Sequence, residues 1–216
     1  MVDYELHQND LPDGIFFGDI LAIDNEMMGL NLFRDRLCLC QIYDGLPNSK
    51  VHMVQFDGTD YSAPNLRALL SDITKIKLLY FARGDMGWIG HYLGVVMENV
   101  YCTKIVSRIA RTYRQDHELE TQCREILGIK MPKEQQCSNW AAPILDPEQL
   151  KYAVNDVLHL HALREALDLL LKQNDRQKLA YDILSCLPAR VQLDLAGWHQ
   201  DQDIFAYMPT ATVQAT

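Results

Sequence analysis

The chain has 216 residues, a length typical of one domain, and its 48% hydrophobic and 23% charged content excludes a disordered or low-complexity protein. No apolar run approaches the roughly 18 residues that span a bilayer, and the acidic start at residues 1–5 lacks the layout of a signal peptide. The six cysteines form no Cys-x-x-Cys pair, so we expect reduced thiols, a cytoplasmic location and no membrane partner.

The chain is acidic, with 29 acidic against 20 basic residues and a formal net charge of -9. A domain that holds long nucleic acids by neutralising their phosphates is normally basic. Carboxylates that surround divalent cations are an exception, because the cations neutralise them in the working protein. The charge therefore argues against a nucleic-acid-binding domain unless acidic residues are gathered at a metal site.

The first half of the chain predicts strands. Three early apolar runs with short connections are typical of an antiparallel meander, at 20–23, 37–43 and 51–56. A further apolar run at 78–82 lies between two segments with helical spacing, at 63–72 and 86–96. A strand between helices is normally added to a sheet in parallel, so we expect a mixed sheet.

Helices predominate in the second half of the chain. They are expected at 103–113, 118–127, 146–172 and 176–187. The third helix has a strong start, with Asp146 as the N-cap, Pro147 at the first helical position and Gln149 three residues after the cap. Together the two halves predict an α/β fold with a mixed sheet, three antiparallel strands followed by parallel strands, flanked by helices.

Asp24 and Glu26 follow the first apolar run. Because side chains alternate along a strand, residues i and i+2 share a face, so both carboxylates can point at one spot. Paired carboxylates beside a buried strand repel each other, and a cation would relieve this repulsion. The other interpretation is a polar strand end in solvent. The Asp-x-Glu pattern does not decide between the two, since it recurs elsewhere in the chain.

Asp85, Tyr152 and Asp156 are the other candidates. Asp85 follows the apolar run at 78–82 and starts a helical pattern, so it is either a site residue or a helix N-cap. Tyr152 and Asp156 are four residues apart and share one face of the predicted helix. An Asp in the middle of so apolar a helix needs a partner if it is buried.

Other kinds of site are not expected. The seven histidines form no His-x-x-x-His pair, and His159 and His161 lie on different faces of a helix, so the sequence predicts no zinc site. The chain also lacks the Gly-x-x-x-x-Gly-Lys phosphate loop and the Gly-x-Ser-x-Gly elbow.

The order of these motifs resembles the DEDDy branch of the 3′–5′ exonucleases, which have a ribonuclease H-like fold. The motifs are a strand-end Asp-x-Glu, then a strand-end Asp, then a helical Tyr-x-x-x-Asp. The surrounding residues are similar to ribonuclease D, in segments 23–30, 34–38, 81–85, 135–140 and 152–158. The resemblance implies a single 3′–5′ exonuclease domain over 1–216, of the short stand-alone type without C-terminal helical RNA-binding domains. Its core spans about 15–172, and a helical extension over 173–208 and a frayed tail follow.

The resemblance implies a site for two divalent cations, Mg²⁺ or Mn²⁺, which take oxygen ligands. Asp24 would bridge both cations. Glu26 and Asp156 would complete the site nearer the attacking water, and Asp85 would hold the second cation. Tyr152 would orient the water, since a phenol with a pKa of about 10 is a poor base at neutral pH.

The resemblance also implies substrate contacts. Leu30 matches the position whose side chain wedges against the terminal base, and Met27 and Met28 precede it in the same motif. The neutral interpretation of these three residues is packing.

The chain departs from the usual residues of the family at Asn25, Gly84 and Asn139, none of which is a metal ligand. Gly84 replaces a larger residue, so we expect it to hold Asp85 less firmly.

The implied function is a metal-dependent 3′–5′ exonuclease. It would hydrolyse phosphodiester bonds at the 3′ end of RNA, or of DNA, and release nucleoside 5′-monophosphates by a two-metal mechanism. The alternative is a catalytically silent ribonuclease H-like module that binds nucleic acid or a protein partner. The retention of four carboxylates and the tyrosine counts against the silent module.

Overall fold

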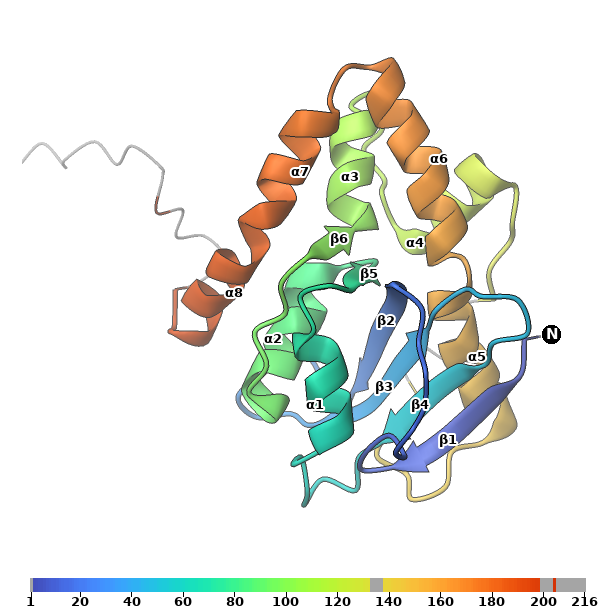
Figure 1. Ribbon diagram of the computed structural model, residues 1–216, viewed down its shortest axis with the longest axis vertical. Helices are drawn as coiled ribbons and strands as arrows, with labels where there is room; N and C mark the ends of the chain where they lie inside the picture. The colour runs from blue at the N-terminus through green and yellow to red at the C-terminus, as the bar shows by residue number, and fades with distance from the viewer. Residues whose placement is uncertain (1, 133–137, 199–203, 205–216) are drawn as a thin grey trace, which may run out of the picture.

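The computed structural model describes residues 2–132, 138–198 and 204. Within them, six strands form one mixed sheet in the order β1-β4-β3-β2-β5-β6 (Figure 1). The strands are β1 (Tyr4–Gln8), β2 (Ile20–Met27), β3 (Leu37–Tyr43), β4 (Val51–Gln55), β5 (Ile76–Leu79) and β6 (Val100–Cys102). The predicted fold class is confirmed, because β2, β3 and β4 are antiparallel neighbours and β5 and β6 add in parallel.

Two of these strands are not evident in the sequence. β1 lies at the edge of the sheet, where its residues alternate between exposed and half-buried positions, so it contains no apolar run. It pairs in parallel with β4. β6 has only three residues, which is too few for a recognisable strand pattern.

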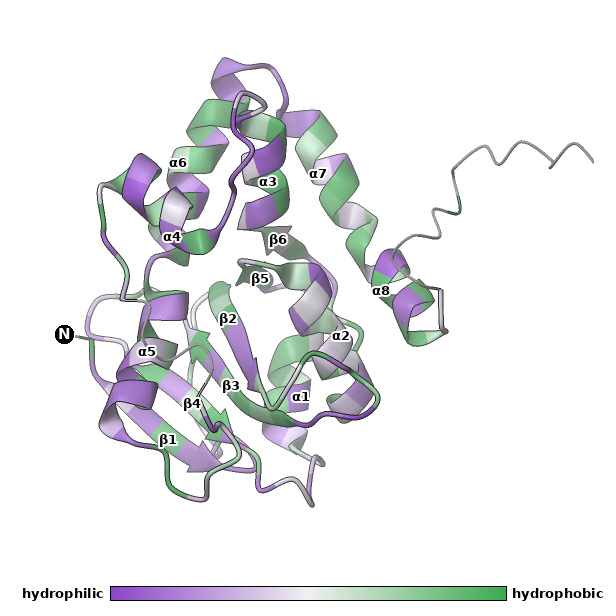
Figure 2. Cartoon of the chain, turned by 180° about the vertical axis from the view of Figure 1, so that it is seen from behind, coloured by the Kyte–Doolittle hydropathy of each residue, from purple (hydrophilic) through white to green (hydrophobic). Residues whose placement is uncertain are grey.

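β2 is longer than its apolar start predicts. The strand continues past Ile23 through the polar residues 24–26 and ends at Met27. Pairing with β3 keeps these polar residues in the strand, with Asp24 opposite Gln41. In Figure 2 the ribbon of β2 accordingly changes from hydrophobic to hydrophilic along its length. The prediction that the carboxylates follow the end of the strand is therefore wrong, since both lie within it.

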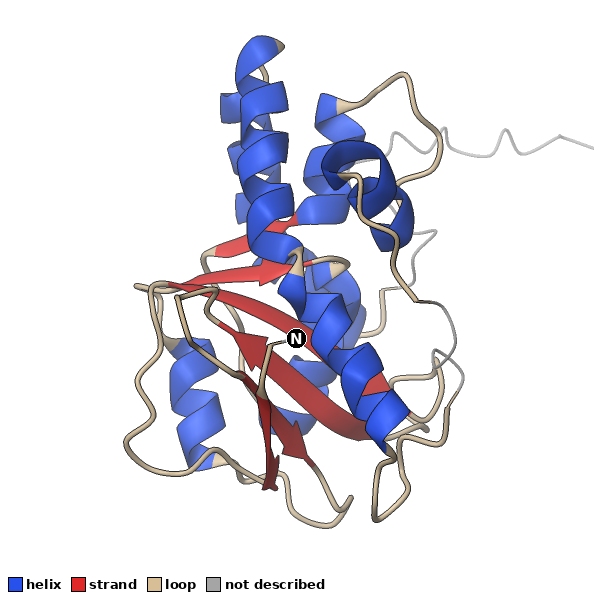
Figure 3. Ribbon diagram, turned by 90° about the vertical axis from the view of Figure 1, so that its right-hand side faces the viewer, coloured by secondary structure: helices blue, strands red, loops and turns tan. Residues whose placement is uncertain are grey.

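Helices lie on both sides of the sheet (Figure 3). In the described ranges they are α1 (Pro64–Ser71), α2 (Ala82–Leu93), α3 (Thr103–Ala110), α4 (Leu119–Gln122), the π-helix η1 (Cys123–Leu127), α5 (Pro147–Leu158), α6 (Leu160–Gln173), α7 (Gln177–Ser185) and α8 (Leu187–Leu195). Helices α3, α6 and α7 pack on one another beyond the β6 edge (Figure 1). None of the helices in these ranges has the length and apolar character needed to cross a membrane.

The predicted helix over 146–172 consists of two helices, α5 and α6, which meet at His159. Its start is as predicted, because the Asp146 carboxylate accepts the N–H groups of Glu148 and Gln149, and the Gln149 side chain accepts the Asp146 N–H. The division has a tertiary cause: α5 packs on β2 and β3, whereas α6 packs on α3 and η1. The predicted helix at 176–187 likewise ends early, and α8 follows it and packs on α2.

The core fixes α5 against the centre of the sheet. β3 is buried along its whole length, so both faces of the sheet are covered there. Ala22, which shares the Asp24 face of β2, and Ala153 and Val157 of α5 are completely buried. The tight packing of α5 sets the position of the polar side chains that this helix directs toward β2.

Candidate active site

Three carboxylates meet where α5 packs on β2. Asp24 and Glu26 share one face of β2 because they are two residues apart, and Asp156 comes from α5. One oxygen atom from each carboxylate lies within 4.8 Å of the other two. Glu26 is almost fully buried, and Asp24 and Asp156 are half-buried. The fold thus brings together acidic residues from the two halves of the chain.

Asp85 approaches this cluster from α2. Strand β5 ends at Leu79 and α2 begins at Ala82, so Asp85 lies in the first turn of the helix, whose N-cap is Phe81. The Asp85 carboxylate is buried and accepts a hydrogen bond from the Asn25 side-chain amide at 3.1 Å. The positive end of the helix dipole favours a negative charge there. The N-cap interpretation of Asp85 is therefore wrong.

Burial raises the pKa values of all four acids, and repulsion raises those of Asp24, Glu26 and Asp156 further. Burial raises the pKa of Asp24 well above its ordinary value, and the charges of the other three carboxylates raise it further. Burial, followed by the charges of Asp156 and Asp85, has the same effect on the pKa of Glu26. Burial raises the pKa of Asp85 to about 7, and burial with the Asp85 charge raises that of Asp156 to about 7. The four groups cannot all be ionised at neutral pH without a compensating positive charge.

The donor set of this cluster fits hard divalent cations. Its ligands are carboxylate oxygens, which Mg²⁺ and Mn²⁺ prefer. Two buried amide oxygens beside it, Asn25 Oδ1 and Gln41 Oε1, have no hydrogen-bond partner in the described part of the chain. The amide nitrogens of the same side chains donate to Asp85 and Glu26, at 3.1 and 3.4 Å. Outer groups of this kind orient carboxylates for a cation.

Tyr152 lies one turn before Asp156 on α5, so the two side chains share one face of the helix. Its ring is half-buried, and the ring centroid of Trp140 lies 6.2 Å away. Burial, followed by the charges of the nearby carboxylates, raises the pKa of Tyr152 well above its ordinary value. The phenol therefore stays protonated at neutral pH, where it can donate a hydrogen bond but cannot act as a general base.

The residues predicted to contact substrate differ in exposure. The Leu30 side chain is 96% exposed, so the interpretation that it packs in the core is wrong. The Met28 side chain is 40% exposed and is not part of the core either. Met27 is half-buried and packs against the core. Leu30 lies in the loop after β2, which ends at Met27, so a large apolar side chain is exposed to solvent close to the carboxylates in sequence.

Phe81, the N-cap of the helix that carries Asp85, and Lys104 were not among the candidates from the sequence. Phe81 is 45% exposed, and Lys104 Nζ lies 5.0 Å from the centroid of its ring. An exposed aromatic ring offers a surface on which a base can stack. The small Gly84 suits this arrangement, because an added Cβ would lie 3.0 Å from Phe81 Cδ1. The sequence signal was the position of Phe81 within the second motif.

The basic residues nearest the motifs are already engaged. The contacts are Arg34 with Asp35, Arg83 with Asp194, Lys151 with Glu148, and Arg36 with the Phe56 carbonyl. The carboxylates are therefore the dominant charges at the site. Of the third motif, residues 135–137 lie outside the described residues.

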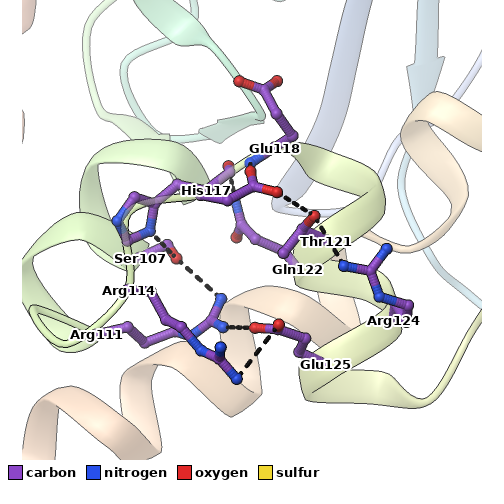
Figure 4. Close-up of polar contacts among 10 residues, drawn as sticks. Ser107, Arg111, Arg114, His117, Glu118, Thr121, Gln122, Arg124 and Glu125 are labelled. Carbon is purple, nitrogen blue, oxygen red and sulfur yellow. Dashed lines mark hydrogen bonds and ion pairs between the residues drawn. The ribbon is translucent and has the colours of Figure 1, made fainter.

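A buried polar network supports α4 and η1 near the site (Figure 4). Ser107 Oγ lies 2.9 Å from His117 Nδ1, and the Arg111 guanidinium donates to Ser107 and pairs with Glu125. The Gln122 amide donates to the His117 carbonyl at 2.8 Å. Ser107 is fully buried, so this Ser–His pair is not an accessible nucleophile. The network instead fastens α4 and η1 against α3.

Comparison with known proteins agrees with this arrangement. A family model described as 3′-5′ exonuclease matches residues 14–172. The chain belongs to this family. Among curated proteins it is 24% identical over 158 residues to ribonuclease D of Nitrobacter hamburgensis, covering 73% of this chain and 40% of the relative. It is 28% identical over 145 residues to ribonuclease D of Zymomonas mobilis, covering 67% of this chain and 36% of that relative. The chain thus spans 40% or less of the length of these two relatives.

Solved structures of exonucleases share the fold. NrnC of Brucella melitensis, solved bound to pGG, is 40% identical with a TM-score of 0.89, covering 96% of this chain and 100% of that one. The same protein with bound Mg²⁺ is 39% identical with a TM-score of 0.88 and the same coverage. Escherichia coli ribonuclease D has a TM-score of 0.70 at 21% identity, covering 81% of this chain and 45% of that one, which supports the fold alone. The predicted ribonuclease H-like fold and ribonuclease D-like exonuclease domain are confirmed.

Asp24→Asn is expected to stabilise the metal-free protein at pH 8 by about 1 kcal/mol, or about 2–4 °C in Tm, because it removes a charge that burial disfavours. At pH 4 this gain should disappear. In the unfolded chain these acids lose their protons near pH 4, whereas in the folded protein they keep them up to about pH 7. The free energy of unfolding of the wild type therefore falls as the pH rises from about 4 to about 7.

Thermal unfolding with a chelator at both pH values measures this effect. Asp19→Asn changes an exposed acid just before β2 and is the matched control, whose Tm should equal that of the wild type at both pH values. An Asp24→Asn protein that is no more stable than wild type at pH 8 would show that repulsion does not govern the cluster.

Tyr152→Phe is expected to lower nuclease turnover by roughly ten- to a thousandfold without changing the affinity for Mn²⁺, because it removes the hydroxyl that shares a helix face with Asp156 and leaves the carboxylates. Single-turnover rates and Mn²⁺ titrations measure the two quantities. Tyr113→Phe removes the hydroxyl of an exposed tyrosine and should behave as wild type. Weaker Mn²⁺ binding in Tyr152→Phe would instead assign the tyrosine to the metal site.

Gly29→Ala is expected to disturb the loop that presents Leu30. Gly29 has φ 153°, and an added Cβ would lie 2.1 Å from Asp35 Oδ2, which itself accepts the Asn31 N–H at 2.9 Å. Gly14→Ala is the control, because Gly14 also has a positive φ but no atom within 4 Å of an added Cβ. Thermal unfolding should show a larger loss for Gly29→Ala than the roughly 1 kcal/mol expected for Gly14→Ala. Equal losses would exclude the Asp35 contact as the cause.

Proposed function

We propose that the protein is a metal-dependent 3′–5′ exoribonuclease that hydrolyses phosphodiester bonds at the 3′ end of RNA and releases nucleoside 5′-monophosphates. The observation that carries this proposal is the convergence of Asp24, Glu26 and Asp156 within 4.8 Å, with Asp85 beside them, in a 3′-5′ exonuclease domain. A catalytically silent module would gain nothing from four carboxylates that repel one another in its interior.

The carboxylates fit two divalent cations, Mg²⁺ or Mn²⁺, and the Mg²⁺-bound structure of Brucella melitensis NrnC supports this choice. Such cations neutralise charge on the scissile phosphate and make water a better nucleophile. Asp24, whose charge interacts with the other three acids, would be shared between the two cations. The Tyr152 hydroxyl would donate a hydrogen bond that helps to orient the attacking water, and the exposed Leu30 would pack against the terminal base.

The charge distribution favours a short substrate. The chain carries a net charge of -9, and the arginines and lysine nearest the motifs are engaged by acidic residues or by a backbone carbonyl. Few basic groups are left to follow a long phosphate backbone. The 40% identical NrnC was solved with pGG, so we propose that short oligonucleotides of this kind enter the site by their 3′ end. The similarity to ribonuclease D favours RNA, and DNA is the second candidate.

A labelled-oligonucleotide assay tests the proposal. RNA of two to ten nucleotides with a 5′ label should shorten one nucleotide at a time, and the same RNA with a 3′ label should release labelled mononucleotide at once. Activity should vanish with a chelator, return with Mg²⁺ or Mn²⁺, and fall by at least about hundredfold in Asp24→Asn. Matched DNA oligonucleotides decide the sugar preference.

Two outcomes would overturn the proposal. Release from the 5′ end would contradict the direction, and wild-type turnover by Asp24→Asn would contradict the site. The cytoplasmic location also stays a proposal, in keeping with the free thiols of Cys38, Cys40, Cys102, Cys123 and Cys186.

A further inference from the structure

A second cluster of metal-ligating side chains lies at the β1 edge of the sheet. Glu5 and His7 are two residues apart on β1 and so share a face, and His52 of β4 pairs directly with Glu5. We call these three residues the Glu-His-His cluster. One ligand atom from each lies within 4.8 Å of the other two.

The strand register places this cluster on the face of the sheet opposite the catalytic carboxylates. Asp24 pairs with Gln41, and Gln41 pairs with Met53 of β4. These paired residues point to the same face, whereas His52 precedes Met53 and points to the other. The Glu-His-His cluster is therefore a separate site and does not extend the first one.

The distances within the cluster match those between ligands of one small cation. His7 Nε2 lies 3.0 Å from His52 Nδ1, and His52 Nδ1 lies 3.7 Å from Glu5 Oε2. A tetrahedral zinc ion with bonds of about 2.0–2.1 Å separates its ligand atoms by about 3.3 Å. The two separations, 3.0 and 3.7 Å, lie on either side of this value, so small side-chain movements would complete the site.

The chemical state of the ligands suits a cation. Burial lowers the pKa of both His7 and His52, so the imidazoles are neutral at neutral pH and can offer a lone pair. Lys50 Nζ binds Oε1 of Glu5 at 2.6 Å, which lowers the pKa of Glu5 and leaves its Oε2 facing His52. The edge of the Phe17 ring packs against the His52 ring and holds it in place.

An open pocket adjoins the cluster and leaves room for a further ligand such as water. It has a volume of about 260 Å³ and is lined by Glu5, Phe16, Phe17, Lys50 and His52, among others. Two imidazoles and one carboxylate with an open fourth position form the donor set of borderline cations such as zinc, whereas Mg²⁺ prefers oxygen ligands alone.

We propose that Glu5, His7 and His52 bind one zinc ion at the β1 edge, independently of the cations at the catalytic carboxylates. The ion would join β1 to β4 in addition to the strand pairing, the contact between His7 and His52 and the ion pair between Glu5 and Lys50. The expectation from the sequence that the histidines form no zinc site was based on spacing along one helix. His7 and His52 are 45 residues apart and meet through the parallel pairing of two strands.

Zinc titration of the full chain by calorimetry tests this proposal, with excess Mg²⁺ present to occupy the catalytic carboxylates. The expected result is one zinc ion per chain, with affinity at least about tenfold weaker in His52→Gln and in Glu5→Gln. His91→Gln alters an exposed histidine and should bind zinc as wild type. Asp24→Asn should also keep the zinc site. Zinc should raise the Tm of wild type but not that of His52→Gln.

Two results would overturn the proposal. Equal zinc affinity in wild type and in both Glu-His-His variants would show that zinc binds elsewhere, and loss of zinc binding in Asp24→Asn would assign it to the catalytic carboxylates. Glu5→Gln provides a second test in case His52→Gln fails to fold, because glutamine has nearly the same size as glutamate. Unchanged Mg²⁺-dependent nuclease activity of His52→Gln would separate this site from the proposed exonuclease function.

Discussion

The repulsion among four carboxylates, two buried and two half-buried, is the constraint on which the rest of the site depends. Each of these groups costs free energy when it is ionised in the protein, and the charges of the other three raise the pKa of Asp24. The surrounding structure holds them together nevertheless, through the pairing of β2 with β3, the packing of α5 on both strands and the hydrogen bond from Asn25 to Asp85. Such a concentration of negative charge is stable at neutral pH only when protons or cations compensate it.

The same constraint explains how an acidic chain can act on an anionic substrate. The fold gathers four acidic residues at one point, where bound cations would turn the negative charge into a site that attracts phosphate. Arg34, Arg83 and Lys151, which lie close to the motifs in sequence, pair with acidic side chains. Recognition is therefore expected to rest on the cations and on exposed apolar groups such as Leu30 and Phe81.

The donor chemistry of the two faces of the sheet differs. The face toward α5 carries oxygen ligands alone, which suit hard cations, and the face toward Phe17 carries two imidazoles and a carboxylate, which suit zinc. Strand alternation separates the two sets, since neighbouring residues of β4 point to opposite faces. A single sheet can thus hold two cation sites without mixing their ligands.

The sequence by itself determined the strand order of the meander, the start of α5 at Asp146 and the family, because these depend on local patterns: apolar runs, capping residues and motifs. It also identified the acidic residues that the fold brings together. It did not show that β2 continues through Asp24 and Glu26, since only pairing with β3 keeps polar residues in that strand.

Other features were decided by tertiary structure alone. The division between α5 and α6 at His159 has no local signal and follows from packing on two different partners, the sheet and α3. β1 has no apolar run, so neither the strand nor its pairing with β4 was visible, and the meeting of His7 with His52 was hidden with it. Contacts between residues 45 positions apart leave no periodic trace in a sequence, because their spacing is set by the path of the whole chain.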